Sequence, residues 1–319
     1  MRSLRWLLAA LGLAGAAVVA LGIYFYVSAP ERVLRAAIAY ERRAAGLERR
    51  ELALPEGLRY AYLEGGRGAP LLLLHGFGAN KDNFVRVAKY LTPHYRVIVP
   101  DHIGFGESSR PPKADYAPRA QAERLHAFAR ALGLSRLHLG GNSMGGHIAL
   151  TYAATYPKEV ESLWLLNAAG VWSAPPSELR RRTAQTGDNP LTVENEDEFA
   201  ELVAMVTARP LMIPRPILDV LAQERIRNFA LEERIAKQLA ADSVEERIRG
   251  LAIPSLIVWG QEDRVLHPGS AGILQMLLIK SEVVMMRNVG HLPMVEEPQA
   301  SALDYLGFRA RLPPSESAR

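Results

Sequence analysis

The sequence of 319 residues contains no cysteine. This absence excludes disulfides, thiolate metal sites and cysteine nucleophiles, and it leaves the redox compartment open. The chain also lacks a charge bias outside its N-terminus: residues 1–50 hold eight arginines and three glutamates, whereas the rest holds 30 basic and 31 acidic side chains. A basic stretch beside an apolar one favours anionic lipid headgroups over nucleic acid as the partner, the alternative being a solvated helix face.

Charge is absent from residues 6–27, a run of 22 residues that reads WLLAALGLAGAAVVALGIYFYV. At a rise of about 1.5 Å per residue this run spans a hydrocarbon core of about 30 Å, and the tyrosines at its end lie where an aromatic belt belongs. We expect an uncleaved transmembrane anchor over residues 1–29. A cleaved signal peptide is the alternative, but the apolar run is longer than a usual h-region and Pro30 follows at once.

Residues 30–50 predict an amphipathic juxtamembrane helix. Pro30 suits a first helical turn. A step of three or four residues places apolar side chains on one face: Val33, Ala37, Tyr40, Ala44 and Leu47. A basic amphipathic helix that follows an anchor is expected to lie at the membrane surface.

Short apolar runs alternate with helical patterns in the remaining chain. The expected strands are Leu71–Leu74, Val97–Val99, Leu137–Leu139, Leu163–Leu166, Leu256–Trp259 and Val283–Met286. The expected helices are Asn83–Leu91, Arg119–Leu132, Gly145–Tyr156, Gly269–Leu278 and Pro298–Phe308. Such alternation predicts an α/β fold with a mostly parallel sheet flanked by helices. The alternation lapses over residues 173–249, which predict a helical cap inserted between two parts of the core, residues 51–172 and 250–319.

Gly141-Asn142-Ser143-Met144-Gly145 has the pattern G-x-S-x-G, directly after one expected strand and before a helix. Glycines in such a turn either cradle a phosphate or hold a nucleophile on a tight bend. A phosphate loop needs a Lys-Ser/Thr pair after the glycines, and a dinucleotide site needs G-x-G-x-x-G; this stretch has neither. The pattern therefore predicts a nucleophile elbow at Ser143.

A serine nucleophile needs a base that is held by an acid. His291 is the best candidate base because its loop follows the expected strand at residues 283–286. Asp263 follows the strand at 256–259, with Glu262 as its local rival, and the order Ser143, Asp263, His291 is the one expected for this elbow. Four other histidines are better explained as structural or surface residues: His94, His126, His138 and His267. His147 lies one helical turn after Ser143 and is too constrained to reach the serine oxygen well.

The tetrahedral intermediate needs two prearranged N–H donors. The Met144 N–H, at the start of the helix after the serine, is the first candidate. The second is expected in the loop LHGFGAN after strand 71–74, at the N–H of Phe77. An ordinary glycine turn would explain this loop if the elbow did not follow it in the sequence.

These motifs together resemble the α/β-hydrolase family over about residues 58–319. The matching stretches are LLLHGFGANKDNF, VPDHIGFGESSRP, LGGNSMGGHIAL, LIVWGQEDRV and NVGHLPMVEEP. The resemblance implies that Ser143 is the nucleophile, that His291 is the base and then the acid, and that Asp263 orients it, with Phe77 and Met144 as oxyanion donors. Branches with an aspartate nucleophile do not fit, because position 143 is serine.

HGFGANKDNF, GNSMGG, the anchor and the cap are similar to those of membrane-anchored monoacylglycerol lipases and the related bacterial membrane-bound phospholipase A. This likeness implies a membrane-bound serine carboxylic-ester hydrolase of lipid esters that needs no cofactor or metal. A C–C bond hydrolase of ring-fission diketones, or a perhydrolase, is the alternative with the same triad. A non-catalytic membrane-bound binding protein is a third reading, which a complete triad disfavours.

The likeness also implies a bacterial inner membrane and a homodimer through the anchor and the adjoining helix. Gly12, Ala16 and Ala20 form a small-residue face that suits such packing. The side of the membrane stays open. Six arginines after the anchor favour a cytoplasmic body, whereas retention of Arg2 and Arg5 inside places the catalytic domain in the periplasm, which we expect.

Overall fold

The computed structural model describes residues 28–314, residues 11–13 and the single positions 6, 15, 22, 24 and 26. Most of the anchor expected over residues 1–29 therefore lies outside the described residues. Within the described part of the chain, no helix is both long enough and apolar enough to cross a membrane.

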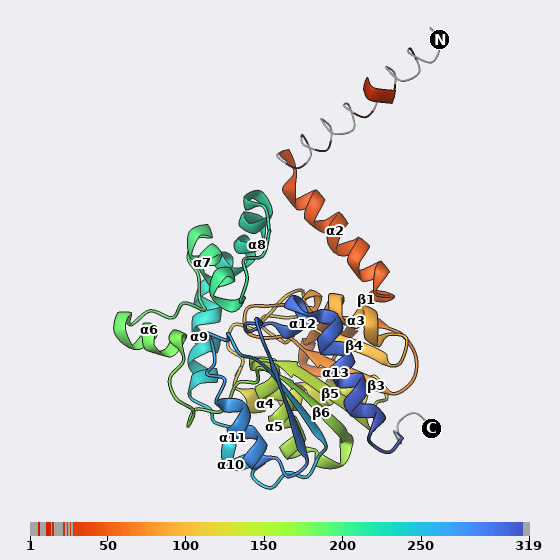
Figure 1. The fold of residues 1–319 in the computed structure, drawn as a ribbon, viewed down its shortest axis with the longest axis vertical. Coiled ribbons are helices and arrows are strands. Elements are labelled where there is room, and N and C mark those ends of the chain that lie inside the picture. Colours follow the sequence, from red (N-terminus) through yellow and green to blue (C-terminus); the bar gives the residue numbers. More distant parts are fainter. Residues whose placement is uncertain are drawn as a thin grey trace.

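A twisted sheet forms the centre of the molecule, with the strand order β1-β2-β4-β3-β5-β6-β7-β8 (Figure 1). The strands are β1 Leu47–Ala53, β2 Arg59–Gly65, β3 Pro70–Leu74, β4 Arg96–Pro100, β5 Leu137–Asn142, β6 Val160–Leu166, β7 Ser255–Gly260 and β8 Ser281–Met286. Strand β2 is antiparallel to β1 and β4, and all other neighbours are parallel. The mostly parallel sheet expected from the sequence is confirmed.

Helices cover both faces of this sheet, and alternate strand residues point to each side. In β3, Leu72 and Leu74 belong to one hydrophobic cluster, while Leu71 and Leu73 belong to the other. The flanking helices are α3 Val85–Leu91, α4 Pro118–Ala131, α5 Met144–Thr155, α11 Ser270–Leu277, α12 Pro293–Glu296 and α13 Pro298–Ala310, with the 3₁₀ turns η1 Pro55–Gly57, η2 Lys81–Phe84 and η3 Pro157–Glu159. A parallel strand buried on both sides needs apolar residues at every position, which explains the run PLLLL.

The expected helix over residues 30–50 is correct only in its first part. Helix α2 spans Pro30–Ala44, and the chain then enters β1, which pairs with β2 along its whole length. Residues 47–53 read LERRELA, whose charged side chains are typical of an exposed helix. Pairing with β2 overrides that local preference, because an edge strand can expose polar side chains while its backbone completes the sheet.

The cap lies between β6 and β7 and projects beyond the carboxyl ends of the strands (Figure 1). Its helices are α6 Glu178–Thr186, α7 Glu196–Val206, α8 Arg215–Arg227, α9 Phe229–Ala240 and α10 Glu245–Ile248. Helix α2 packs against α8 as well as α3, so the segment after the expected anchor contacts both the cap and the core.

Candidate active site

Ser143 lies at the turn between β5 and α5, with φ 53° and ψ −119°. Such backbone angles cost about 1–3 kcal/mol for a residue with a side chain and persist only where the surroundings enforce them. They are enforced here, because the Ser143 N–H donates to Leu166 O at 3.1 Å and its carbonyl accepts the Ala169 N–H at 2.9 Å. The turn thus holds the serine in a strained conformation at the carboxyl end of the sheet.

Glycine is required on both sides of this serine. A Cβ on Gly141 would lie 2.3 Å from the carbonyl oxygen of Gly145, and a Cβ on Gly145 would lie 2.1 Å from that of Leu74. Both contacts are to backbone atoms that cannot move away. The G-x-S-x-G pattern therefore has the steric meaning expected from the sequence, a strand and a helix that meet too closely for side chains.

His291 and Asp263 meet in the buried region beside this turn. The His291 Nδ1 donates to Asp263 Oδ2 at 2.9 Å, and both residues are buried. The other carboxylate oxygen accepts the N–H groups of Val265 at 2.8 Å and Leu266 at 3.1 Å. A carboxylate acceptor at Nδ1 places the proton on that nitrogen, so Nε2 is left with the lone pair that a general base needs.

Asn167 is a further buried residue of this site, and the sequence analysis did not single it out. Its Nδ2 donates to Asp263 Oδ2 at 2.6 Å, and its Oδ1 accepts the Gly260 N–H at 3.3 Å. The side chain therefore fixes Asp263 from the end of the neighbouring strand. Its position directly after the apolar run of β6 was the available signal, because polar residues at that edge meet in parallel sheets.

Glu296 fixes the loop of His291 from the opposite side. Its carboxylate accepts the N–H groups of Gly290 at 3.0 Å and of Ala208, a cap residue, at 2.8 Å. Burial raises the pKa of Glu296, while these backbone hydrogen bonds lower it. The backbone N–H of His291 also donates to the backbone oxygen of Val206 in the cap at 2.9 Å, so hydrogen bonds join the cap to the histidine loop at two places.

The expected oxyanion donors lie on the two segments that meet at the serine. A Cβ on Gly76 would be 3.3 Å from Ser143 Cβ, so the loop that carries Phe77 passes against the turn. Met144 is the first residue of α5, and N–H groups in the first turn of a helix have no partner within it. The Phe77 N–H makes no hydrogen bond to another described residue.

The Ser143 hydroxyl and the His291 ring are not hydrogen-bonded to each other in the described part of the chain. Catalytic hydrogen bonds are often long without substrate and tighten when it binds, so this geometry agrees with a nucleophile and base at rest. The structure thus brings His291 and Asp263 into contact. It places Ser143 and the two candidate donors beside each other at the same edge of the sheet.

Most of the rival histidines have other partners. His138 Nδ1 is 2.9 Å from Ser162 Oγ, His147 Nε2 is 2.9 Å from the Asp242 carboxylate, and His126 is 3.1 Å from Glu159. The His267 Nδ1 accepts the Gly269 N–H, and His94 is exposed.

Among the described residues no group of three or more histidine, cysteine or acidic side chains is arranged to hold a metal ion.

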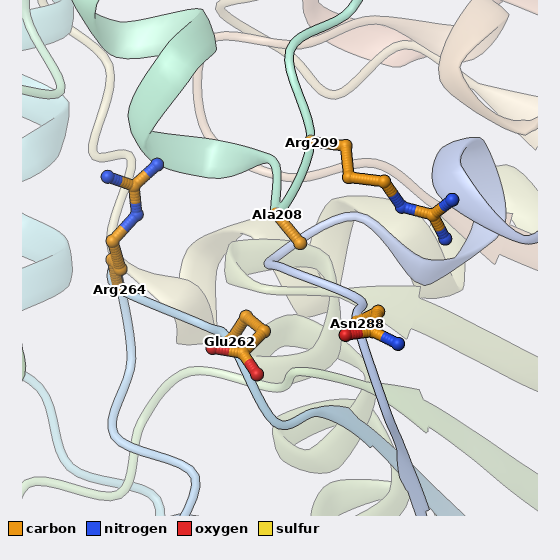
Figure 2. A pocket seen from close by; sticks show the side chains of 5 residues that line it. All are labelled: Ala208, Arg209, Glu262, Arg264 and Asn288. Carbon is orange, nitrogen blue, oxygen red and sulfur yellow. The ribbon is translucent and has the colours of Figure 1, made fainter.

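Glu262, the rival of Asp263, is exposed. It lines a cavity of ≈ 410 Å³ together with Ala208, Arg209, Arg264 and Asn288 (Figure 2). Its carboxylate is not hydrogen-bonded to His291, whereas that of Asp263, the next residue, is buried and bonded to it.

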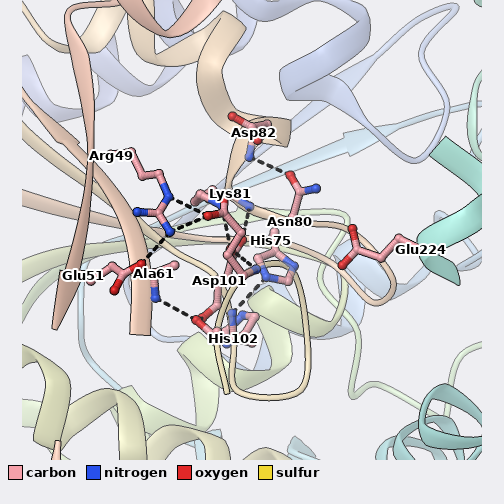
Figure 3. Close-up of polar contacts among 12 residues, drawn as sticks. Arg49, Glu51, Ala61, His75, Asn80, Lys81, Asp82, Asp101, His102 and Glu224 are labelled. Atoms are coloured by element: carbon pink, nitrogen blue, oxygen red, sulfur yellow. Dashed lines mark hydrogen bonds and ion pairs between the residues drawn. The ribbon is translucent and has the colours of Figure 1, made fainter. Parts of the chain in front are cut away.

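An ionic network that extends from a buried lysine–aspartate pair to the surface holds the segment that follows Phe77 (Figure 3). The Asp101 carboxylate is fully buried and accepts the Lys81 N–H and the Lys81 Nζ, each at 2.7 Å. Lys81 Nζ also donates to Glu107 at 2.7 Å, and Glu107 accepts Arg49 Nε at 2.5 Å from β1. The start of η2 is thereby tied to the loop after β4 and to the edge of the sheet.

The fold and this site define an α/β hydrolase with a serine elbow and a buried histidine–aspartate pair. The family model described as alpha/beta hydrolase fold matches residues 69–298, and the chain belongs to that family.

Individual relatives cover most of the chain. It is 45% identical over 282 residues to Lipase 1 of Psychrobacter immobilis, which covers 86% of this chain and 88% of that protein. It is 29% identical to the mouse monoacylglycerol lipase ABHD6, with 88% of each chain covered. Among solved structures, it is similar to that of a bacterial membrane phospholipase A described as a virulence factor, with a TM-score of 0.85, 41% identity, and coverage of 94% of this chain and 97% of the other.

Proposed function

We propose that this protein is a membrane-bound serine hydrolase that cleaves lipid esters through an acyl-enzyme on Ser143. The family and its lipase-named relatives define the enzyme as a carboxylic ester hydrolase. The observation that carries the finer proposal is the 2.9 Å hydrogen bond from His291 to Asp263, beside a serine held at φ 53°. A nucleophile, a base and an orienting acid at the carboxyl edge of one sheet are the parts that acyl transfer needs.

In the first half of the reaction, Ser143 Oγ attacks the acyl carbonyl carbon while His291 Nε2 takes the hydroxyl proton. The carbonyl oxygen becomes an oxyanion, which the N–H groups of Phe77 and Met144 stabilise. Asp263 stabilises the imidazolium that forms and remains ionised. When the intermediate collapses, the carbon–oxygen bond to the alcohol breaks, and the leaving oxygen takes the proton from His291.

In the second half, water replaces the alcohol. His291 Nε2 takes a proton from the water as its oxygen attacks the acyl-enzyme, and the same two N–H groups stabilise the second oxyanion. The bond from the acyl carbon to Ser143 Oγ then breaks, and the serine takes the proton back. A fatty acid is released, and His291 has carried every proton transfer of the cycle.

Lipid esters are the substrate class that the N-terminus supports best. The uncharged run of 22 residues at 6–27 suits an anchor, and helix α2, which follows it, carries arginines and has no buried residue. An anchor keeps the enzyme at a surface where lipids are concentrated. We further propose that the catalytic domain lies on the periplasmic side of a bacterial inner membrane, and that two copies pair through the small-residue face of the anchor and through α2.

The test measures hydrolysis by the full chain in detergent micelles and its labelling by a fluorophosphonate. We expect turnover of p-nitrophenyl esters and of at least one of monoacylglycerol, lysophospholipid and phospholipid. We expect Ser143→Ala to abolish both turnover and labelling in a folded protein. Wild-type turnover by that variant would refute the assignment. Cleavage of a ring-fission diketone, with lipid esters left intact, would point to the carbon–carbon bond hydrolases instead.

A further inference from the structure

Arg225, on cap helix α8, lies directly against the loop that carries Phe77. Its guanidinium carbon is 5.6 Å from the centroid of the Phe77 ring. A Cβ on Gly78, whose φ is +65°, would lie 2.1 Å from that guanidinium carbon. The planar group of Arg225 therefore packs against the Gly78 backbone and lies near the Phe77 ring. The cap reaches the candidate oxyanion loop through this side chain.

The charge of Arg225 is buried and paired within the cap. Its Nε donates to the two carboxylate oxygens of Glu232 at 2.9 and 2.7 Å, and its Nη2 donates to Leu191 O at 2.5 Å. Arg225 is 7% exposed and Glu232 is 3% exposed. Burial raises the pKa of Glu232, whereas Arg225 lowers it. A buried ion pair of this kind adds little net stability compared with apolar residues, but it fixes the direction of a planar group.

The contact of Arg225 involves Phe77, whose backbone N–H must be positioned accurately if it is an oxyanion donor. An oxyanion donor must point at the place where the reacting oxygen will develop charge, about 2.7–3.1 Å from the donor nitrogen. The Phe77 N–H is part of a loop rather than of a helix or strand, so its own secondary structure does not fix it. The ring of Phe105, a core residue, packs edge-on against the Phe77 ring, with ring centroids 5.7 Å apart. Arg225 is the contact that the cap supplies.

We propose that Arg225 is a positioning residue that holds the Phe77–Gly78 segment in the geometry of an oxyanion hole. The inference rests on the proposed function, in which the Phe77 N–H is a donor to the tetrahedral intermediate. It makes the cap part of the catalytic apparatus. The ion pair between Arg225 and Glu232 joins helices α8 and α9, and these helices set the position of a backbone donor in the core.

The test uses Arg225→Gln and the double variant R225M/E232M in the full chain. The double variant removes both buried charges and replaces them with apolar side chains of similar length, so it is expected to fold. We expect each to lower kcat on a p-nitrophenyl ester about 10–100-fold, in the range found when an oxyanion donor is lost, with KM changed less than about 2-fold. Arg225→Lys, which keeps the charge without the planar group, is expected to recover only part of kcat.

A transition-state analogue separates positioning from a general loss of structure. A trifluoromethyl ketone forms an oxyanion on the serine, so its affinity is expected to fall by the same factor as kcat, whereas affinity for a fatty-acid product stays unchanged. The matched control is Arg110→Gln. The Arg110 guanidinium pairs at 2.5 Å with Glu224, which lies on α8 next to Arg225, and neither Arg110 nor Glu224 is part of the catalytic machinery. We expect this variant to keep kcat within about 2-fold.

Three outcomes decide between the ideas. A folded R225M/E232M variant with wild-type kcat and wild-type affinity for the ketone would overturn the role of Arg225 and leave the proposed function intact, provided that Ser143→Ala is inactive. An equal loss in the Arg110→Gln control would also overturn it, because any cap contact would then have the same effect. A wild-type chain without serine-dependent ester hydrolysis would refute the proposed function, and the role of Arg225 with it.

Discussion

The side-chain amide of Asn142 donates to the backbone oxygen of His291 at 2.9 Å, across 149 positions of sequence. The same Nδ2 also donates to Leu166 O at 3.0 Å. The residue before the candidate nucleophile is thereby joined to the loop of the candidate base and to the neighbouring strand. Since Asn142 is almost fully buried, this contact is a fixed part of the site.

Replacing Asn142 with alanine is expected to lower kcat about 100-fold, because a displacement of about 1 Å in a reacting group has an effect of that order. Two buried carbonyl groups also lose a donor, which lowers the free energy of unfolding by about 1–3 kcal/mol. Steady-state kinetics and urea unfolding measure the two effects. Asn195→Ala is the control. The Asn195 side chain caps the N-terminus of α7, the opposite end from Val206, which contacts the His291 loop, so this change lowers stability by about 1 kcal/mol without lowering kcat. Equal kcat values for the two variants would contradict the prediction.

Asp263→Asn tests which of two adjacent acids orients the base. An amide at position 263 can present an N–H to His291 Nδ1, which favours the wrong imidazole tautomer, and in a triad this change lowers kcat about 10⁴-fold. Glu262→Gln is the matched control, because Glu262 is exposed and lines a separate cavity (Figure 2). We expect a loss of that order only for Asp263→Asn, measured on p-nitrophenyl esters. A comparable loss in Glu262→Gln would contradict the assignment.

The sequence predicted the parallel core of the sheet because its strands are continuous apolar runs between glycine-containing loops. It also placed Ser143, Asp263 and His291 at one edge, since chemistry-bearing residues after parallel strands share that edge. Asn142 and Asn167 were missed. For Asn167, the position directly after the apolar run of β6 was a signal. The role of Asn142 depends on which backbone atoms face it in the folded chain, and no spacing in the sequence encodes that.

The edge of the sheet was harder to predict for a different reason. Strand β1 carries four charged residues in LERRELA, and its hydrogen bonds to β2 form only after the chain reverses. Residues 30–44 are helical and the same periodicity continues by chance to Leu47, so local pattern favoured one longer helix. The contact of Arg225 with Phe77 joins residues 148 positions apart and was equally invisible to local reasoning.

Glu107 gives a prediction on acid stability. Its hydrogen bonds to Arg49 and Lys81 outweigh its burial and lower the pKa of its carboxyl from 4.5 to about 2. A carboxyl whose pKa is depressed by folding stabilises the protein fully above pH 4.5, and this contribution is lost as the pH falls from 4.5 towards 2. Glu107→Gln is therefore expected to lower the urea midpoint at pH 7, with a difference from wild type that shrinks across that window.

The control for this variant is Glu48→Gln on the neighbouring strand, since the Glu48 side chain is 78% exposed and its contact with Arg50 is 3.5 Å long. Urea midpoints at pH 7, 5, 4 and 3 are compared for the three proteins. We expect Glu48→Gln to follow the wild type at every pH. A difference between Glu107→Gln and wild type that grows as the pH falls would contradict the prediction.

The absence of cysteine from the sequence allows a direct test of whether the cap contacts a bilayer. Met212, between α7 and α8, is 100% exposed. Its neighbours form a short apolar segment that has an arginine at each end, RPLMIPR, residues 209–215. Helix α8 begins at residue 215 and packs against α2, and both lie at the same end of the molecule (Figure 1). An exposed apolar tip flanked by arginines suits the boundary between acyl chains and headgroups.

We expect a fluorophore on Met212→Cys to be quenched by doxyl-labelled lipids when the full chain is reconstituted in nanodiscs of phosphatidylethanolamine and phosphatidylglycerol. Met276→Cys is the matched control, because Met276 is 79% exposed but lies on α11, which in Figure 1 is at the opposite end from α8. Its fluorophore should stay unquenched and its emission unshifted. Equal quenching at the two positions, or none at residue 212 in a reconstituted and active enzyme, would show that the cap tip does not enter the bilayer.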